Sequence, residues 1–458
     1  MSLISALRNG TAHTYEEAFG AKDITSTEMR SAIADWFELY LQRKPSEEED
    51  PCQQIPYTVV NKLYKTAFSE YTASSDDEFA EKVINALNAK KKKAMQMALV
   101  GGEALLKPVP LRDGWHWSVI RRDDLLVFSC DDDGRFTDIG TIERTVSNTL
   151  YYTLLERRTV DEYGYLTIRN MLYSSPNEGS VGSPVPLTAL PKYAELAPLY
   201  TFAKPVGSIG LVSLRTPMEN CVDGSNAAVS VYAAAVGLIH NINVNEAQLN
   251  GEFKRGESRI ITSADLLKKD KSGRRDFRDH VFVGLDDDAE NVGVTIFSPT
   301  LREQSFHDRK REYLRSVENV IGLKRGLLSE VEATNKTATE VTSSAGDYNL
   351  TIIDFQGMWD EAVCEAVRLC GVLGQLYHIP GAHEVPEDKI ILDFGDGVLY
   401  NREQVGNEML RQVQMGLLAP ERYLGWYYEL PCDTPEERSK IRETYMPDSE
   451  ELSEGDEE

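Results

Sequence analysis

The chain of 458 residues is too long for one hydrophobic core, so we expect about two to four structural units. Its 41% hydrophobic and 9% aromatic residues are typical of a globular protein. The net charge is −25, from 74 acidic and 49 basic residues. This argues against nucleic-acid binding by general electrostatic attraction, which needs Lys and Arg to neutralise phosphates.

Cysteine usage and hydropathy exclude further classes. The six cysteines are scattered without a Cys-x-x-Cys pair, so neither a zinc site nor a disulfide framework is indicated and a reducing cytosol is expected. The first residues lack the basic and apolar regions of a signal peptide. The most apolar run, 227–244, is rich in small residues and falls short of the ~20 residues of a membrane span. We expect no membrane association.

The N-terminal half predicts helices followed by strands. Residues 26–43 are amphipathic, and further helical stretches are expected at 58–71 and 76–99. The last of these contains four consecutive lysines, Lys90–Lys93, which we interpret as a solvated helix face. Short segments rich in β-branched and aromatic residues then alternate with turns, which predicts a β-meander over 103–175.

The second half predicts two helices around a small unit. A helix with a small-residue face is expected from Ser225. A compact segment, 251–298, is first basic and then acidic, and the charged helix Leu301–Ile321 follows. The stretch ATNKTATEVTSS then predicts a helix start, because Thr337 and Glu340 have the spacing of a capping box.

A long helical region should follow this start. We expect it to be interrupted near Gly346 and to reach about Tyr377. A strand in KIILDFGD, helices from Asn401 and an acidic, disordered tail complete the chain. The buried face of the long region is predicted to contain Trp359, Val363, Val367 and Cys370.

Several motifs suggest metal or nucleotide chemistry without the residues that would complete it. DFGDG, from Asp393, resembles the magnesium tripeptide of kinases, but no other kinase motif accompanies it and we predict a strand ending in a turn. CDDDG, from Cys130, is predicted to be a plain turn, because a calcium loop would need Glu where Gly140 stands. No Walker A sequence is present, so ATP hydrolysis is not expected.

Five segments together suggest a family. They are SAIADWFELYLQR, YYTLLERRTVDEYGYLTIRNMLYSS, SVYAAAVGLIHNINVNEAQLNGEF, GLLSEVEATNKTATEV and QMGLLAPERYLGWYYELP. In order and spacing the chain resembles the portal proteins of tailed bacteriophages, in the branch of long-tailed phages of Gram-positive hosts. Residues 251–298 contribute least to the resemblance, and Gly346-Asp347 departs from it.

The resemblance implies an α+β, mostly helical portal fold with a β-meander in the wing and a small α/β clip. The implied parts are the wing (1–224), stem helix 1 (225–250), the clip (251–298), stem helix 2 (299–322), the tunnel loop (323–337), a long helix with a strand returning to the wing (338–400), crown helices (401–447) and an acidic tail (448–458).

The resemblance also implies a function without catalysis or cofactors. Twelve subunits would form a ring at one capsid vertex of the virion, assembled in the host cytoplasm, as the channel for double-stranded DNA packaging and ejection. The implied partners are the large subunit of the terminase motor, head–tail adaptor proteins, and the major capsid and scaffolding proteins.

Candidate contact residues follow from these parts. The DNA-channel set comprises Lys324, Arg325, Lys336, Asn335, Thr334, Arg302 and Arg309. The set expected to meet the motor and adaptors comprises Lys254, Arg255, Lys268, Lys269, Arg274 and Arg275. Arg302 and Arg309 share a helix face and either meet acids of a neighbouring subunit or face the channel. The bases near the loop either touch phosphates transiently or are simply solvated.

Two alternatives remain open from the sequence. One is a metal-dependent nuclease or other phage DNA-processing enzyme using Asp286–Asp288 or Asp393 and Asp396. The other is a different head–tail connector, although such proteins are generally shorter than this chain.

Overall fold

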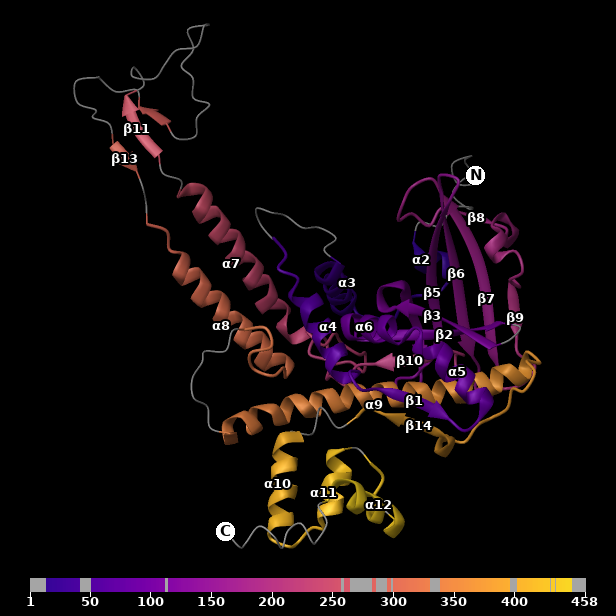
Figure 1. Cartoon of the computed structure of the whole chain (residues 1–458). Coiled ribbons are helices and arrows are strands. Elements are labelled where there is room, and N and C mark those ends of the chain that lie inside the picture. The colour runs from indigo at the N-terminus through magenta and orange to yellow at the C-terminus, as the bar shows by residue number, and fades with distance from the viewer. Residues whose placement is uncertain are drawn as a thin grey trace, which may run out of the picture. The chain divides into compact units, whose positions relative to one another are not determined.

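The computed structural model describes residues 14–41, 51–111, 114–256, 259–263, 282–285, 295–297, 300–329, 338–395, 402–428, 430–432 and 434–446 (Figure 1). The chain divides into two compact units, residues 1–392 and 393–458. Helices and largely antiparallel sheets are both present, so the predicted α+β class is confirmed.

The first unit begins with short helices. They are α2 (Tyr15–Phe19), α3 (Thr27–Leu41), α4 (Ile55–Ala67), α5 (Glu78–Asn88) and α6 (Lys91–Gly101). The single helix predicted at 76–99 is wrong, because the amide of Lys90 donates to the carbonyl of Leu87 in a tight turn that separates α5 from α6.

The lysine run is only partly a solvated face. Lys92 and Lys93 are exposed, as predicted. The Lys91 ammonium instead lies 3.7 Å from the ring centroid of Tyr71 and 5.1 Å from that of Phe68. Burial there lowers the pKa of Lys91 to about 8.

The predicted meander forms two sheets rather than one. The strands are β2 (Glu103–Leu111), β3 (Gly114–Arg121), β4 (Leu125–Cys130), β5 (Phe136–Ser147), β6 (Leu150–Val160), β7 (Leu166–Ser175), β8 (Ser183–Val185), β9 (Leu199–Thr201) and β10 (Val212–Arg215). One sheet has the order β10-β2-β3, and the other has the order β4-β5-β6-β7-β8 with β9 also on β7. Only β4–β7 is the expected antiparallel meander.

The division between the sheets lies at the 3-10 turn Arg122–Asp124. The Arg122 side chain is buried and donates to the carbonyl of Leu125 at 3.3 Å and to the hydroxyl of Thr25 at 3.2 Å. A long-range contact to the N-terminal segment therefore fixes this turn, which local strand propensity does not reveal.

The helix expected from Ser225 starts later. After the 3-10 turn Ala233–Ala235, α7 spans Val236–Arg255. The small-residue segment before it is non-helical and buried, because the amide of Val231 and the hydroxyl of Ser230 both donate to the carbonyl of Leu99 in α6. A Cβ on Gly102 would lie 2.4 Å from the carbonyl oxygen of Ala228. Small residues here allow close approach to the end of α6 instead of helix-to-helix packing.

A small sheet lies in the chain between α7 and the next helix, α8 (Glu303–Ile321). Its strands are β11 (Arg259–Ser263), β12 (Phe282–Leu285) and β13 (Thr295–Phe297). β11 pairs in parallel with β12 and antiparallel with β13.

A 39-residue helix, α9 (Ala338–Leu376), ends the helical part of the first unit. It runs through Gly346, so the predicted interruption is wrong; one helical glycine costs only about 1 kcal/mol relative to alanine. The strand β14 (Ile390–Asp393) follows and pairs with β1 (Thr72–Ser75). The predicted buried face of α9 is confirmed, since Trp359, Val363, Val367 and Cys370 are all fully buried.

The second unit contains the helices expected from Asn401. They are α10 (Arg402–Gln414), α11 (Pro420–Tyr427) and α12 (Pro435–Tyr445). Thr434 begins α12 with a capping box to Glu437, and the Arg442 guanidinium of α12 donates to the buried carboxylate of Glu421 in α11. The acidic tail lies outside the described residues.

Candidate nucleic-acid interface

The helices α7 and α8 pack side by side as an antiparallel pair (Figure 1). The side-chain amide of Asn245 donates to the carbonyl of Phe306 at 3.1 Å, and Arg302 contacts Glu252 at 2.9 Å. Later positions of α7 thus meet earlier positions of α8. The end of α7 and the start of α8 therefore lie together, next to the strands β11–β13 in the chain.

Hydrogen bonds also connect this pair to Gln53, which lies just before α4. The Lys310 ammonium of α8 donates to Glu246 of α7 at 2.8 Å and to the side chain of Gln53 at 2.9 Å. The backbone amide of Gln53 in turn donates to the side-chain oxygen of Asn243 at 2.9 Å. Lys310 is therefore held by internal partners.

Three arginines line a cavity of about 550 Å³ at the joined ends of α7 and α8. We name Arg255, Arg302 and Arg309 the arginine cluster. The other lining residues are Gln248, Glu252, Ser305 and Phe306. One carboxylate thus faces three guanidinium groups, so the cavity carries positive charge.

The arginine cluster is held by weak or exposed contacts. Arg302 donates to both carboxylate oxygens of Glu252, at 3.1 and 2.9 Å, while its own side chain is 70% exposed. The hydrogen bond from Arg302 lowers the pKa of Glu252, and the same bond raises the pKa of Arg302. Arg309 donates to the Tyr313 hydroxyl at 3.0 and 2.8 Å. Exposed guanidinium groups with several donors are suited to phosphate oxygens.

A second group of basic residues follows α8. We name residues 322–329 the basic turn. Gly322 ends α8 with φ 76°, Gly326 has φ 91°, and the amide of Leu327 donates to the carbonyl of Lys324 at 3.0 Å. Leu323 is buried, whereas Lys324 and Arg325 are exposed. The turn therefore presents its two cations to solvent.

Arg325 also lies over the end of α8. It lines a cavity of about 410 Å³ together with Arg315, Ser316, Glu312 and Asn319. Two guanidinium groups from separate segments thus share one cavity, which Glu312 and Glu318 also line.

The structure brings some of the predicted residues together and separates others. Arg302 and Arg309 share a face, as predicted, and Arg255 from the second predicted set joins them. Arg302 meets an acid of its own chain, which neither predicted possibility included. Lys254 is exposed in the last turn of α7. Outside the described residues lie Thr334, Asn335, Lys336, Lys268, Lys269, Arg274 and Arg275.

Sequence reasoning missed Glu318, which is 1% exposed in the last turn of α8 and accepts hydrogen bonds from the basic turn. A signal for it exists in the sequence. A carboxylate near a helix C-terminus opposes the helix dipole, so such a residue requires a specific partner.

The motifs considered for metal chemistry are turns where they are described. The Asp393 carboxylate accepts from the amide of Gly395 at 2.8 Å, and the Asp131 carboxylate accepts from the amides of Asp133 and Arg135 at 3.0 and 2.8 Å. Asp286–Asp288 and Asp396 lie outside the described residues. Across the part of the chain that is described, no three His, Cys, Asp or Glu side chains gather as metal ligands would.

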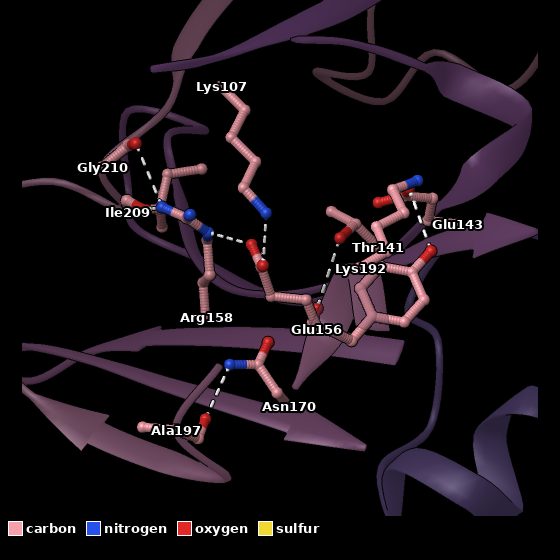
Figure 2. A network of polar contacts seen from close by, with 11 residues as sticks. Lys107, Thr141, Glu143, Glu156, Arg158, Asn170, Lys192, Ala197, Ile209 and Gly210 are labelled. Carbon is pink, nitrogen blue, oxygen red and sulfur yellow. Dashed lines mark hydrogen bonds and ion pairs between the residues drawn. The ribbon is translucent and has the colours of Figure 1, made fainter. Parts of the chain in front are cut away.

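The carboxylate of Glu156 in the sheets belongs to a separate, buried network (Figure 2). Glu156 of β6 binds Arg158 at 2.7 Å and also the Lys107 ammonium of β2, and Arg158 donates to the carbonyls of Ile209 and Gly210 at 3.0 Å. Burial by itself raises the pKa of Glu156, but the charges of Arg158 and Lys107 outweigh it and lower the pKa to about 2. These partners are all internal, so the network joins the two sheets.

No protein-family model matches the sequence, and no curated protein matches it. The chain is similar to a solved structure described as the neck of a native GTA particle computed with C12 symmetry, at 12% identity and a TM-score of 0.44. The likeness covers 91% of this chain and 97% of that chain. Agreement at this level establishes neither a shared family nor a shared fold.

None of the described helices combines the length and apolar character that crossing a membrane requires.

Proposed function

We propose that the chain is the subunit of a ring-shaped portal, through which double-stranded DNA enters and leaves a phage capsid. The resemblance of five ordered sequence segments motivates the proposal. The observation that carries it is the succession of an antiparallel helix pair, an exposed basic turn and a 39-residue helix. This arrangement fits a stem, a tunnel loop and the long helix behind it.

The charge distribution is better suited to a channel through which DNA moves than to a site that holds DNA in place. The helix α8 carries Arg309, Lys310, Arg311 and Arg315 against Glu303, Asp308, Glu312 and Glu318, so its formal charges cancel. Each phosphate neutralised by a cation adds salt-sensitive affinity, and many such contacts would hold DNA in place. Two exposed arginines, Arg309 on this neutral helix and Arg302 at its N-cap, support light contact with a moving duplex.

The proposal includes no enzymatic step and no cofactor. Its partners are other copies of the chain in a ring of about twelve, double-stranded DNA, the terminase large subunit and the head–tail adaptors. Copies of the chain would meet head to tail, because a closed ring of this kind is built from heterologous contacts. Major capsid and scaffolding proteins would surround the ring at a virion vertex.

Electron microscopy of the purified protein, viewed end-on, tests this proposal. The expected result is an annulus with a central hole. A compact monomer without a hole, in a soluble and native sample, would overturn the proposal.

A magnesium-dependent nuclease is the competing function. Incubation of the ring with linear duplex DNA and Mg²⁺ separates the two, because a portal leaves the DNA intact. Cleavage that an Asp393→Asn variant abolishes would favour the nuclease.

A further inference from the structure

We propose that Glu318 is a positioning residue that fixes the basic turn, so that Lys324 and Arg325 are presented in one conformation to the DNA. The importance of these two cations for DNA rests on the proposed function. The anchoring of the turn by Glu318 rests only on the contacts below.

The Glu318 carboxylate accepts hydrogen bonds from four donors of the basic turn. The amide of Gly326 is shared between both oxygens at 3.1 Å. The amides of Leu328 and Ser329 donate to Oε1, the latter at 2.8 Å, and the Ser329 hydroxyl donates to Oε2 at 2.8 Å. One side chain thereby satisfies three backbone amides of the turn.

Without those four donors, burying the Glu318 carboxylate at this position would lower the stability of the folded protein. Glu318 lies in the last turn of α8, where the helix dipole disfavours negative charge, and its side chain is buried. A buried carboxylate without hydrogen-bond partners strongly destabilises a folded protein. The basic turn supplies them, so folding of the turn and burial of Glu318 depend on each other.

One peptide group of the turn is held from both sides. Its amide, on Leu328, donates to Glu318, while its carbonyl, on Leu327, accepts from the Lys62 ammonium of α4. At the start of the turn Leu323 is buried, and its amide donates to the carbonyl of Glu318 at 2.8 Å. Lys324 and Arg325 therefore project from a backbone fixed before and after them.

The test compares Glu318→Gln with Glu303→Gln, an exposed glutamate on the same helix, in the purified full-length protein. The glutamine amide would place donors against the donors of the turn. Hydrogen exchange of the segment containing Gly326, Leu328 and Ser329 should accelerate by about tenfold or more in Glu318→Gln and stay unchanged in Glu303→Gln. Lys62→Met should accelerate exchange in the same segment to a smaller extent.

Positioning is separated from mere stabilisation by a double-mutant cycle. Retention of linear duplex DNA by the ring is measured against salt for Glu318→Gln, Arg325→Ala and the double variant. Arg325→Ala should have little further effect once Glu318 is replaced, because the arginine is already misplaced.

Each outcome decides a different point. Unchanged exchange in Glu318→Gln would overturn the anchoring, whatever the protein does. Faster exchange with additive effects on DNA would overturn positioning. If Arg325→Ala alone leaves DNA retention unchanged, the proposed role of the turn in the portal fails, while the exchange result still decides whether Glu318 anchors it.

Discussion

The buried network around Glu156 and the exposed arginine cluster on α7 and α8 use the same residue types to different ends. Around Glu156, both cations have fixed partners within the sheets, and Arg158 is almost fully buried. In the arginine cluster, Arg302 is 70% exposed and lies in one cavity with Arg255 and Arg309. Buried charged side chains stabilise the fold, whereas exposed charged side chains remain available to bind a polyanion.

The sharpest test of this difference is Arg158→Met. The substitution keeps much of the side-chain volume but leaves Glu156 with one cation and removes the donor to Ile209 and Gly210. Removing one partner of a buried ion pair typically costs about 3–5 kcal/mol. Chemical denaturation at fixed protein concentration measures the decrease in unfolding free energy. Arg169→Met, at an exposed position of the neighbouring strand, is the control and should change stability by about 0.5 kcal/mol or less. Equal effects of the two substitutions would show that the buried Arg158 contributes no more to stability than an exposed arginine does.

Lowering the pH should decrease the stability of the protein by protonating Glu156 in the buried network. Because the pKa of Glu156 is lowered in the folded protein to about 2, its contribution to stability is complete above its ordinary pKa near 4.5 and disappears as pH falls toward 2. The difference corresponds to about 3 kcal/mol. Denaturation of wild type and Glu156→Gln between pH 6 and 2 should show a steeper decrease in stability for wild type. Parallel curves would mean that Glu156 is not the responsible group.

Under the proposed portal function, replacing both exposed cations of the basic turn should alter DNA packaging without altering ring assembly. Lys324→Ala combined with Arg325→Ala removes two cations whose side chains are exposed. For every phosphate that is no longer neutralised, the slope of log affinity against log salt should become shallower by about 0.9. Ring formation is followed by electron microscopy, and DNA packaging by the yield of infectious particles. Unchanged packaging would exclude these residues from the mechanism.

The smallest effect on stability is expected for Arg302→Ala. Its ion pair with Glu252 is exposed, so thermal unfolding should not change measurably. Retention of duplex DNA should nevertheless become less sensitive to salt than in Lys204→Ala, an exposed control in the first unit. A destabilised Arg302→Ala protein with unchanged salt sensitivity would place Arg302 with the structural charges.

Sequence patterns predicted the elements whose stability is local. The periodic apolar residues of α9 and α3 and the charged pattern of α8 specified helices. The segments rich in β-branched and aromatic residues specified the strands β4–β7. The seven-residue spacing of Arg302 and Arg309 likewise determined that they share a face.

Tertiary contacts decided the remainder. Arg122 divides the strands into two sheets through its contact with Thr25, which is far away in the sequence. The carbonyl of Leu99 likewise binds the small-residue segment before α7 and keeps it out of that helix. Glu252 joins the arginine cluster, and Glu318 meets the basic turn, only because α7, α8 and the turn fold together. Local propensity spans a few residues along the chain, whereas a buried polar group takes whichever partner the completed fold places beside it.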